Sequence, residues 1–334
     1  MDVQHVFTDR AVKEEFLDRF DDLKAKAPQV GGLEGIDGDL SKDDAVEVAD
    51  RIEEGSFVSG TRPGLEAIIE RFTRPVYLVQ DSEFDVPPDD FPNSDEIKAR
   101  VGAAEATLER IIPSVGRVDV RNHRLDWLGT AWMVAPGVAV TNRHVAEEVA
   151  QRDNGNFVFR SFSGAPPVSA TVDWRHEFQR GTESRFRVEE VIWIEPPESV
   201  DVALLRLTDQ GEAGDAQPPV VELMTDDLGD DVVGDWVAVI GYPAFDSRND
   251  QADQQRIFDG IYNVKRLAPG KVTARRGADV LNHDSTTLGG NSGSVVVDLD
   301  SGKAVGLHFG GLEGERNDAV QAPRLQRILA ERLL

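Results

Sequence analysis

The last two thirds of the chain consist of short apolar runs, and this feature limits the possible folds more than any other. From about Ser114 onward, runs of four to seven residues rich in Val, Ile, Leu and Trp alternate with Gly, Pro, Asn and Asp turns. Many short strands without long helices between them favour antiparallel barrels or a sandwich over a parallel α/β sheet. We therefore expect strands at residues 116–120, 128–134, 138–141, 157–161, 168–174, 188–194, 202–207, 236–240, 271–274, 294–298 and 304–309.

The first 110 of the 334 residues have a helical pattern instead. Apolar residues at helical spacing predict helices at 11–26, 42–54, 64–72 and 94–112, with Ser41 and Ser94 as N-caps. A short β-like run at 75–80 precedes an acidic, proline-bearing stretch at 81–93, which we interpret as an extended connector. The chain closes with a helix expected at 322–334 and packed on the β region, because one apolar stripe is formed by Leu325, Ile328, Leu329 and Leu333.

The charge of the chain is strongly negative, with 36 basic against 61 acidic residues and a formal net charge of −25. This sign argues against nucleic acid or an anionic membrane as the main partner, since both require basic surfaces. The first hundred residues carry 25 acidic and 12 basic residues and are more negative per residue than the rest. A composition rich in Asp and poor in Lys fits adaptation to high salt and GC-rich coding equally well.

The sequence contains no cysteine, which excludes a disulfide framework, zinc–thiolate and iron–sulfur sites, and a cysteine nucleophile. Residues 1–20 carry acids from Asp2 onward and lack an apolar core of signal-peptide length. The longest apolar runs have the length of strands and not of membrane helices. We therefore expect a cytoplasmic protein.

Three polar residues stand at positions where chemistry is expected. His144 follows the apolar run Val138-Ala-Val-Thr, so a strand would hold it at the mouth of a cleft, where a general base can act. Asp201 begins the strongly apolar run Val202-Ala-Leu-Leu, and a carboxylate that enters a core needs a partner. Ser292 has glycines nearby on both sides, which allow a backbone that exposes a nucleophile and aims successive N–H groups at one point.

Together, and in the order His, Asp, Ser, these motifs resemble the chymotrypsin-like serine peptidases over residues 114–334. Thr141-Asn-Arg-His144 resembles the Thr-Ala-Ala-His motif of that family, Asp201-Val-Ala-Leu-Leu resembles Asp-Ile-Ala-Leu-Leu, and Gly290-Asn-Ser292-Gly resembles Gly-Asp-Ser-Gly. The resemblance implies a mainly β fold, a trypsin-like double antiparallel β-barrel, here with a helical N-terminal extension and a C-terminal helix. We expect the peptidase domain at 111–334, with barrel one at about 114–222, barrel two at about 223–318 and the helix at 322–334.

The same resemblance implies the roles of the site residues. Ser292 would be the nucleophile, His144 the general base that takes its proton, and Asp201 the group that orients the imidazole. The backbone N–H groups of Gly290 and Ser292 would form the oxyanion hole. The chemistry requires no metal and no cofactor.

The residue before the serine departs from the digestive enzymes, because Asn291 stands where they have Asp. Their activation switch, in which a new N-terminal amine pairs with a buried carboxylate, therefore has no acceptor here. The run Gly-Gly-Asn-Ser-Gly-Ser and the downstream Gly-Leu-His-Phe-Gly-Gly resemble the glutamyl endopeptidase branch instead. In that branch the residues matching Thr287 and His308 line the primary pocket and bind an acidic side chain; a hydrophobic or broad preference is the alternative.

The predicted function is a serine endopeptidase that forms an acyl-enzyme and acts on an intracellular protein or peptide substrate. A catalytically silent trypsin-fold binding protein, or a peptidase that processes only itself, remains an alternative. Residues 1–110 form the predicted acidic, mostly helical region, either a regulator or docking module for an effector protein or a scaffold packed on the barrels. Of the remaining histidines, His123 and His176 are expected at the surface, and His283 with Asp284 is expected to shape the serine loop.

Overall fold

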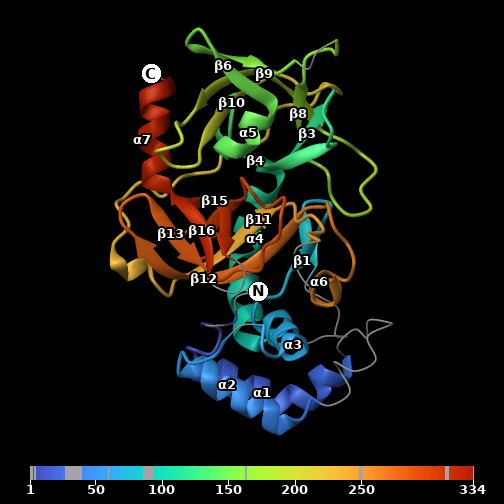
Figure 1. Cartoon of the computed structure of the whole chain (residues 1–334), viewed down its shortest axis with the longest axis vertical. Helices are drawn as coiled ribbons and strands as arrows, with labels where there is room; N and C mark the ends of the chain where they lie inside the picture. The colour runs from blue at the N-terminus through green and yellow to red at the C-terminus, as the bar shows by residue number, and fades with distance from the viewer. Residues whose placement is uncertain are drawn as a thin grey trace.

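The computed structural model describes residue 3 and residues 5–26, 40–58, 60–85, 93–161, 164–247, 251–312 and 316–333. Two six-stranded antiparallel β-barrels form the body of the protein, as the motif resemblance predicted, with helices before and after them (Figure 1). The first barrel lies at the top of the view, the second in the middle, and the first three helices at the bottom. Among the described helices, none is both long and apolar enough to cross a membrane.

The first barrel closes in the strand order β10-β5-β4-β3-β8-β9. Its interior is filled by apolar residues that alternate along the strands, such as Val118, Met133 and Leu205. Between β5 and β8 the chain makes a short helix, α5, and a separate hairpin, β6–β7. The elements are β3 (Val115–Arg121), β4 (Trp127–Ala135), β5 (Val138–Thr141), α5 (Arg143–Val149), β6 (Ala150–Asp153), β7 (Asn156–Phe159), β8 (Ser169–Asp173), β9 (Arg185–Ile194) and β10 (Ala203–Leu207).

The second barrel has the order β11-β14-β15-β16-β13-β12 and is closed by pairing of β11 with β12. Its strands are β11 (Trp236–Gly241), β12 (Arg266–Arg276), β13 (Val280–His283), β14 (Val295–Asp298), β15 (Ala304–Leu312) and β16 (Arg316–Gln321). The helix α6 (Gln251–Phe258) lies between β11 and β12 in the chain, and short 3₁₀ turns occupy Ile112–Ser114 and Asp230–Val232. The last helix, α7 (Ala322–Leu333), packs Leu325 and Ile328 into the core, as its apolar stripe predicted.

The N-terminal helices α1 (Arg10–Lys26), α2 (Lys42–Glu53) and α3 (Pro63–Thr73) share an apolar core of their own. Ser41 caps α2 in a capping box with Asp44, as expected. Ser94 precedes α4 (Asp95–Ile111), but its side chain does not cap that helix. Glu15 of α1 accepts the Asp95 N–H at 3.1 Å instead and provides an acceptor for the first turn from another helix.

Three elements from the first 111 residues join or pack on the barrels. Strand β1 (Tyr77–Gln80) pairs with β12 and forms a hairpin with β2 (Glu83–Asp85), so the second barrel's sheet gains two strands. Helix α4 buries Ile97, Val101 and Leu108 in the core cluster that also holds side chains of both barrels and α7. The predicted connector at 81–93 is therefore a turn and a strand up to Asp85, and its part at 86–92 lies outside the described residues.

Candidate active site

The ends of two paired strands bring His144 and Asp201 together. Strands β5 and β10 are antiparallel, with Thr141 opposite Ala203, so His144 and Asp201 extend from the same end of the pair. His144 Nδ1 lies 2.7 Å from Asp201 Oδ2, and the His144 N–H donates to Asp201 Oδ1 at 3.1 Å. The carboxylate thus fixes both the backbone and the ring of His144, and the ring's Nε2 is left to face another group.

Neighbouring residues hold this pair in place. The Asn142 amide donates to the Asp201 carbonyl oxygen at 3.0 Å. Arg143 donates from Nη1 to the carbonyl oxygens of Pro196, Ser199 and Val200, at 3.0 to 3.2 Å. The loop before Asp201 is therefore tied to α5, and the side chain of His144, which is 46% exposed, stands on an ordered base.

Ser292 reaches the first barrel from the loop between β13 and β14. The Thr130 N–H of β4 donates to the Ser292 carbonyl oxygen at 2.8 Å, and the Gly293 N–H donates to the carbonyl oxygen of His308 on β15 at 2.8 Å. Gly293 has a φ of +89° and no room for a side chain, because a Cβ there would lie 2.0 Å from the Thr130 carbonyl oxygen. The serine loop is thus held between the two barrels, on the side of β4 where His144 stands.

Gly290, two residues before Ser292, shapes the backbone so that two nearby N–H groups have no hydrogen-bond acceptor among the described residues. Gly290 has a φ of +86°, and a Cβ on it would meet the Trp127 ring at 2.4 Å. In the part of the chain that the structure describes, no hydrogen bond uses the N–H of Gly290 or of Ser292. Two backbone donors beside a serine and without acceptors among the described residues are able to receive the oxygen of a ligand.

No hydrogen bond joins Ser292 Oγ to His144 within the described residues, although Asp201 orients the imidazole. Serine–histidine contacts are commonly loose before substrate binds and tighten in the complex. Asn291 is buried and its Oδ1 lies 3.3 Å from Ser294 Oγ, so this side chain is engaged within its own loop. No group of three or more His, Asp or Glu side chains is placed to hold a metal ion in the described parts of the chain.

Thr287 and His308 lie beside the serine loop and are held by two residues that the sequence did not link to them. Thr287 Oγ1 donates to Asn317 Oδ1 at 2.5 Å. His308, which is 3% exposed, has its Nδ1 3.2 Å from Nε2 of the buried His283. Because β13, β15 and β16 are adjacent strands, these contacts follow from strand register and could not be found from local sequence.

Burial sets the protonation of the two histidines. It lowers the pKa of His283 to about 3 and, as the largest cause, holds the pKa of His308 well below its ordinary value. Both rings are therefore neutral at pH 7. A single proton lies between them, and if His283 Nε2 donates it, His308 carries its own proton on Nε2.

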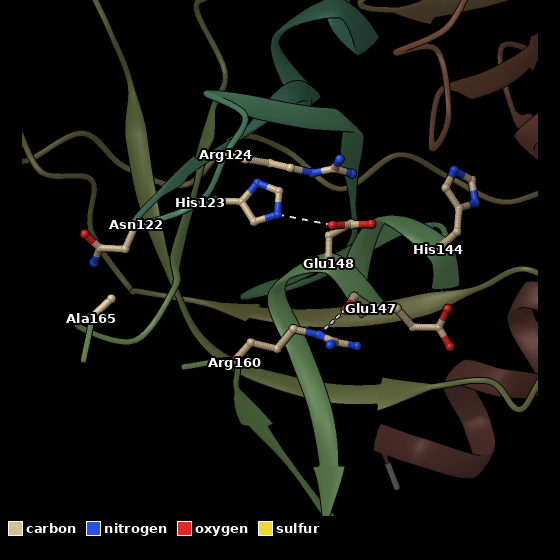
Figure 2. A pocket seen from close by; sticks show the side chains of 8 residues that line it. All are labelled: Asn122, His123, Arg124, His144, Glu147, Glu148, Arg160 and Ala165. Atoms are coloured by element: carbon tan, nitrogen blue, oxygen red, sulfur yellow. Dashed lines mark hydrogen bonds and ion pairs between the residues drawn. The ribbon is translucent and has the colours of Figure 1, made fainter. Parts of the chain in front are cut away.

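A pocket of about 810 Å³ has His144 among the residues that line it (Figure 2). Its wall includes His123, whose side chain is 2% exposed, so the expected surface position of His123 is wrong. The Leu125 N–H donates to His123 Nδ1 at 3.2 Å, and the opposite nitrogen, Nε2, therefore carries the proton and donates to Glu148 at 3.1 Å. The full lining is Asn122, His123, Arg124, His144, Glu147, Glu148, Arg160 and Ala165.

The protein is similar to known peptidases in sequence and in structure. A probable serine protease from Lysobacter enzymogenes is 30% identical over 277 residues, which cover 76% of this chain and 70% of that protein. The active form of the Rv3671c protease from M. tuberculosis is 18% identical with a TM-score of 0.44, covering 70% of this chain and 86% of its own. The serine endoprotease from Yersinia pestis is 18% identical with a TM-score of 0.45, covering 68% and 65%. Residues 129–307, more than half of the chain, match the family described as the trypsin-like peptidase domain, and the protein therefore belongs to that family of serine peptidases.

Proposed function

We propose that this serine endopeptidase cleaves peptide bonds with Ser292 as nucleophile, His144 as general base and Asp201 as the orienting carboxylate. The observation that carries the assignment is the 2.7 Å contact between His144 Nδ1 and Asp201 Oδ2. It directs His144 Nε2 away from the carboxylate, so that nitrogen is the one available for the serine proton. The Ser292 carbonyl oxygen accepts a hydrogen bond from Thr130 on β4, and β4 pairs with β5, the strand that leads to His144.

The proposed reaction follows from these positions. His144 Nε2 takes the proton from Ser292 Oγ while the oxygen attacks the carbonyl carbon of the scissile bond. The negative oxygen of the tetrahedral intermediate is held by the N–H groups of Gly290 and Ser292, and each such donor contributes about 3–4 kcal/mol in comparable sites. The imidazolium, stabilised by Asp201, returns the proton to the leaving amine. Water then hydrolyses the acyl-enzyme by the same route.

A fluorophosphonate probe tests this assignment directly. The wild-type protein should become labelled on Ser292, and Ser292→Ala should not, with mass spectrometry of the modified peptide as the readout. Folded wild-type protein that stays unlabelled in both low and multimolar salt would favour the silent binding protein. Fragments that form on storage of the wild type, but not of Ser292→Ala, would support self-processing.

We further propose that Thr287 and His308 form a primary pocket that prefers Glu or Asp before the scissile bond. A neutral His308 with its proton on Nε2 can donate to a carboxylate, and proton uptake would strengthen the contact. The Thr287 hydroxyl, which now donates to Asn317, would have to turn toward the substrate. The net charge of −25 opposes an acidic substrate everywhere except at such a local donor.

The pH dependence of cleavage tests the pocket. Since burial holds the pKa of His308 low in the free protein, binding of a carboxylate would raise it and take up a proton. The kcat/KM ratio of a Glu peptide over the matching Gln peptide should therefore rise as pH falls from 8 toward 6. A ratio that does not depend on pH, or that survives in His308→Ala, would contradict the pocket assignment.

We propose the cytoplasm as the compartment and a dedicated protein as the substrate. Fractionation of cells that produce the protein tests the first, and proteomic comparison of cells with wild type or Ser292→Ala tests the second. For residues 1–110 we propose a control function.

A further inference from the structure

The loop that leads from β13 to the catalytic serine is held by the N-terminal helical region. This loop, residues 284–287, begins with a buried Asp284 and ends with Thr287, which lies in the proposed primary pocket. Helix α3 lies directly against the second barrel, between it and the first two helices (Figure 1). Glu70, in the last turn of α3, and Arg74, directly after the helix, contact this loop.

Arg74, the residue that ends α3, forms a buried ion pair with Asp284. Its Nε and Nη2 donate to the two carboxylate oxygens at 2.8 and 2.6 Å, and the side chains are 2% and 0% exposed. Asp284 Oδ1 also accepts the Lys271 N–H at 2.6 Å. A two-point contact between guanidinium and carboxylate fixes the orientation of both groups. Arg74 therefore sets the position at which the loop leaves β13.

Glu70 provides a second contact one turn earlier in α3. Thr286 Oγ1 lies 2.9 Å from Glu70 Oε1 and 2.8 Å from the Arg74 carbonyl oxygen. Glu70 is 3% and Thr286 5% exposed, so water does not replace these bonds. Thr286 directly precedes Thr287, so a shift of the Thr286 backbone would also move Thr287.

The opposite side of the loop is fixed by the barrel itself. Asn317 on β16 donates to the Ser285 carbonyl oxygen at 2.8 Å and accepts from Thr287 at 2.5 Å. Gly270 on β12 has no room for a side chain, because its Cβ would meet Ser285 at 2.4 Å. The loop is thus enclosed by β12, β16 and the end of α3, and among the described residues its contacts from outside the barrels come from α3 and Arg74.

We propose that Glu70 and Arg74 are positioning residues for the primary pocket, so that the N-terminal region supports substrate binding by the peptidase and does not inhibit it. This inference rests on the proposed function. It assigns to the first helices a specificity-determining role: they hold the pocket wall through Asp284 and Thr286, and none of their atoms needs to touch the substrate. Without these contacts the loop keeps only its bonds to β12 and β16.

The test compares two variants of the full-length protein, Thr286→Val and Thr286→Ser. Valine has the shape of threonine without the hydroxyl, and serine keeps the hydroxyl. Thr286→Val should raise KM for the best peptide about 3- to 10-fold with kcat nearly unchanged, as expected for one lost hydrogen bond that affects binding of substrate and transition state equally. Thr286→Ser should restore KM to near the wild-type value. Arg74→Met should raise KM further.

Labelling and stability measurements separate the role in the pocket from general damage. The rate of fluorophosphonate labelling of Ser292 should stay within about threefold of wild type in every variant, because a small probe does not fill the pocket. Lys13→Met is the matched control: Lys13 is mostly buried, pairs with Asp50 at 2.7 Å within the N-terminal helices and lies away from the loop. It should lower the thermal midpoint without changing KM.

Three results would overturn the inference and leave the proposed function standing. The first is normal labelling with an unchanged KM in Thr286→Val and Arg74→Met, and the second is an equal rise of KM in Lys13→Met at an equal loss of stability. The third is an increase of kcat/KM in Arg74→Met, which would overturn the inference in favour of inhibition. A wild-type protein that is neither labelled nor active would overturn the proposed function, and the positioning role with it.

Discussion

The contacts of Asp201 and Arg143 hold His144 so that one nitrogen of its ring, Nε2, stays available. Asp201 takes both the ring Nδ1 and the backbone N–H of His144, and Arg143 fixes the preceding loop. His144 can therefore exchange protons only through Nε2. In the proposed reaction, Asp201 would therefore act on the serine only through the orientation of the imidazole.

The substitution Asp201→Asn tests whether the carboxylate sets the protonated nitrogen of His144. An amide can donate to Nδ1 and would favour the tautomer in which Nε2 carries the proton, which cannot accept one from Ser292. We expect kcat to fall about 10³- to 10⁴-fold while the fold is retained. Steady-state kinetics and circular dichroism provide the readouts, and Asp226→Asn, on an exposed loop, should behave like wild type. A loss below tenfold would contradict the role of Asp201.

The sequence was sufficient to identify His144, Asp201 and Ser292 as candidates, because each stands in a local motif. It was not sufficient to find Asn317 or the contact of His283 with His308, because these depend on the pairing of β13, β15 and β16. Asp284 was expected to shape the serine loop. Its partner, Arg74, lies 210 residues earlier, and no local pattern connects the two.

At the scale of elements, the predicted strands include β5 and β11, which have continuous apolar runs, and β3, which has Arg117 and Asp119 between apolar residues. Strands β13 and β16 were missed because they carry Asn282, His283, Asn317 and Asp318, which bond to one another or line the site. Helix α6 was missed because its sequence, rich in Gln and Asp, has little apolar periodicity. Polar side chains that pair across strands hide the alternation on which strand prediction depends.

One buried lysine joins three elements. Lys265, next to β12, donates from Nζ to Glu177 at 3.0 Å, to the Ile112 carbonyl oxygen at 2.9 Å and to the Trp174 carbonyl oxygen at 2.7 Å. It thus connects the second barrel to the end of α4 and to the chain after β8. Burial lowers the pKa of Lys265 to about 8, so the side chain is still charged at pH 7.

Removal of this lysine should be strongly destabilising. Lys265→Met leaves Glu177 buried without its main cation, and breaking a buried pair in this way costs about 3–5 kcal/mol of unfolding free energy. Urea denaturation followed by tryptophan fluorescence would measure the loss. Lys303→Met, which removes the exposed pair with Glu222, should leave the midpoint unchanged. Equal midpoints for the two variants would show that the Lys265 contacts do not hold the barrels together.

At the scale of the whole molecule, the buried His283 and the partly buried His176 make stability depend on pH. Burial lowers the pKa of His283 to about 3 and that of His176 to about 4, against 6.5 in the unfolded chain. The unfolded chain therefore binds more protons than the folded one below pH 6.5. The stabilising effect of each neutral ring is complete above pH 6.5 and is lost as pH falls toward the folded pKa.

The expected result is a steady loss of stability on acidification from pH 6.5 to about 4. His283 alone contributes a slope of about 1.4 kcal/mol per pH unit over that range. Urea midpoints measured between pH 7.5 and 4.5 give the total slope, and His283→Leu should reduce it by about that amount. The same slope in His283→Leu and wild type would mean that His283 does not remain neutral in the folded protein.

The closure of the second barrel also determines when the site can exist during synthesis of the chain. Strand β16, residues 316–321, pairs with both β13 and β15, and its Asn317 holds the loop that contains Thr287. A nascent chain that has been synthesised only as far as Ser292 lacks this strand, so Asn317 cannot yet hold the loop. A polypeptide that ends before residue 316 therefore cannot close this part of the second barrel, and the loop with Thr287 keeps none of its contacts to Asn317.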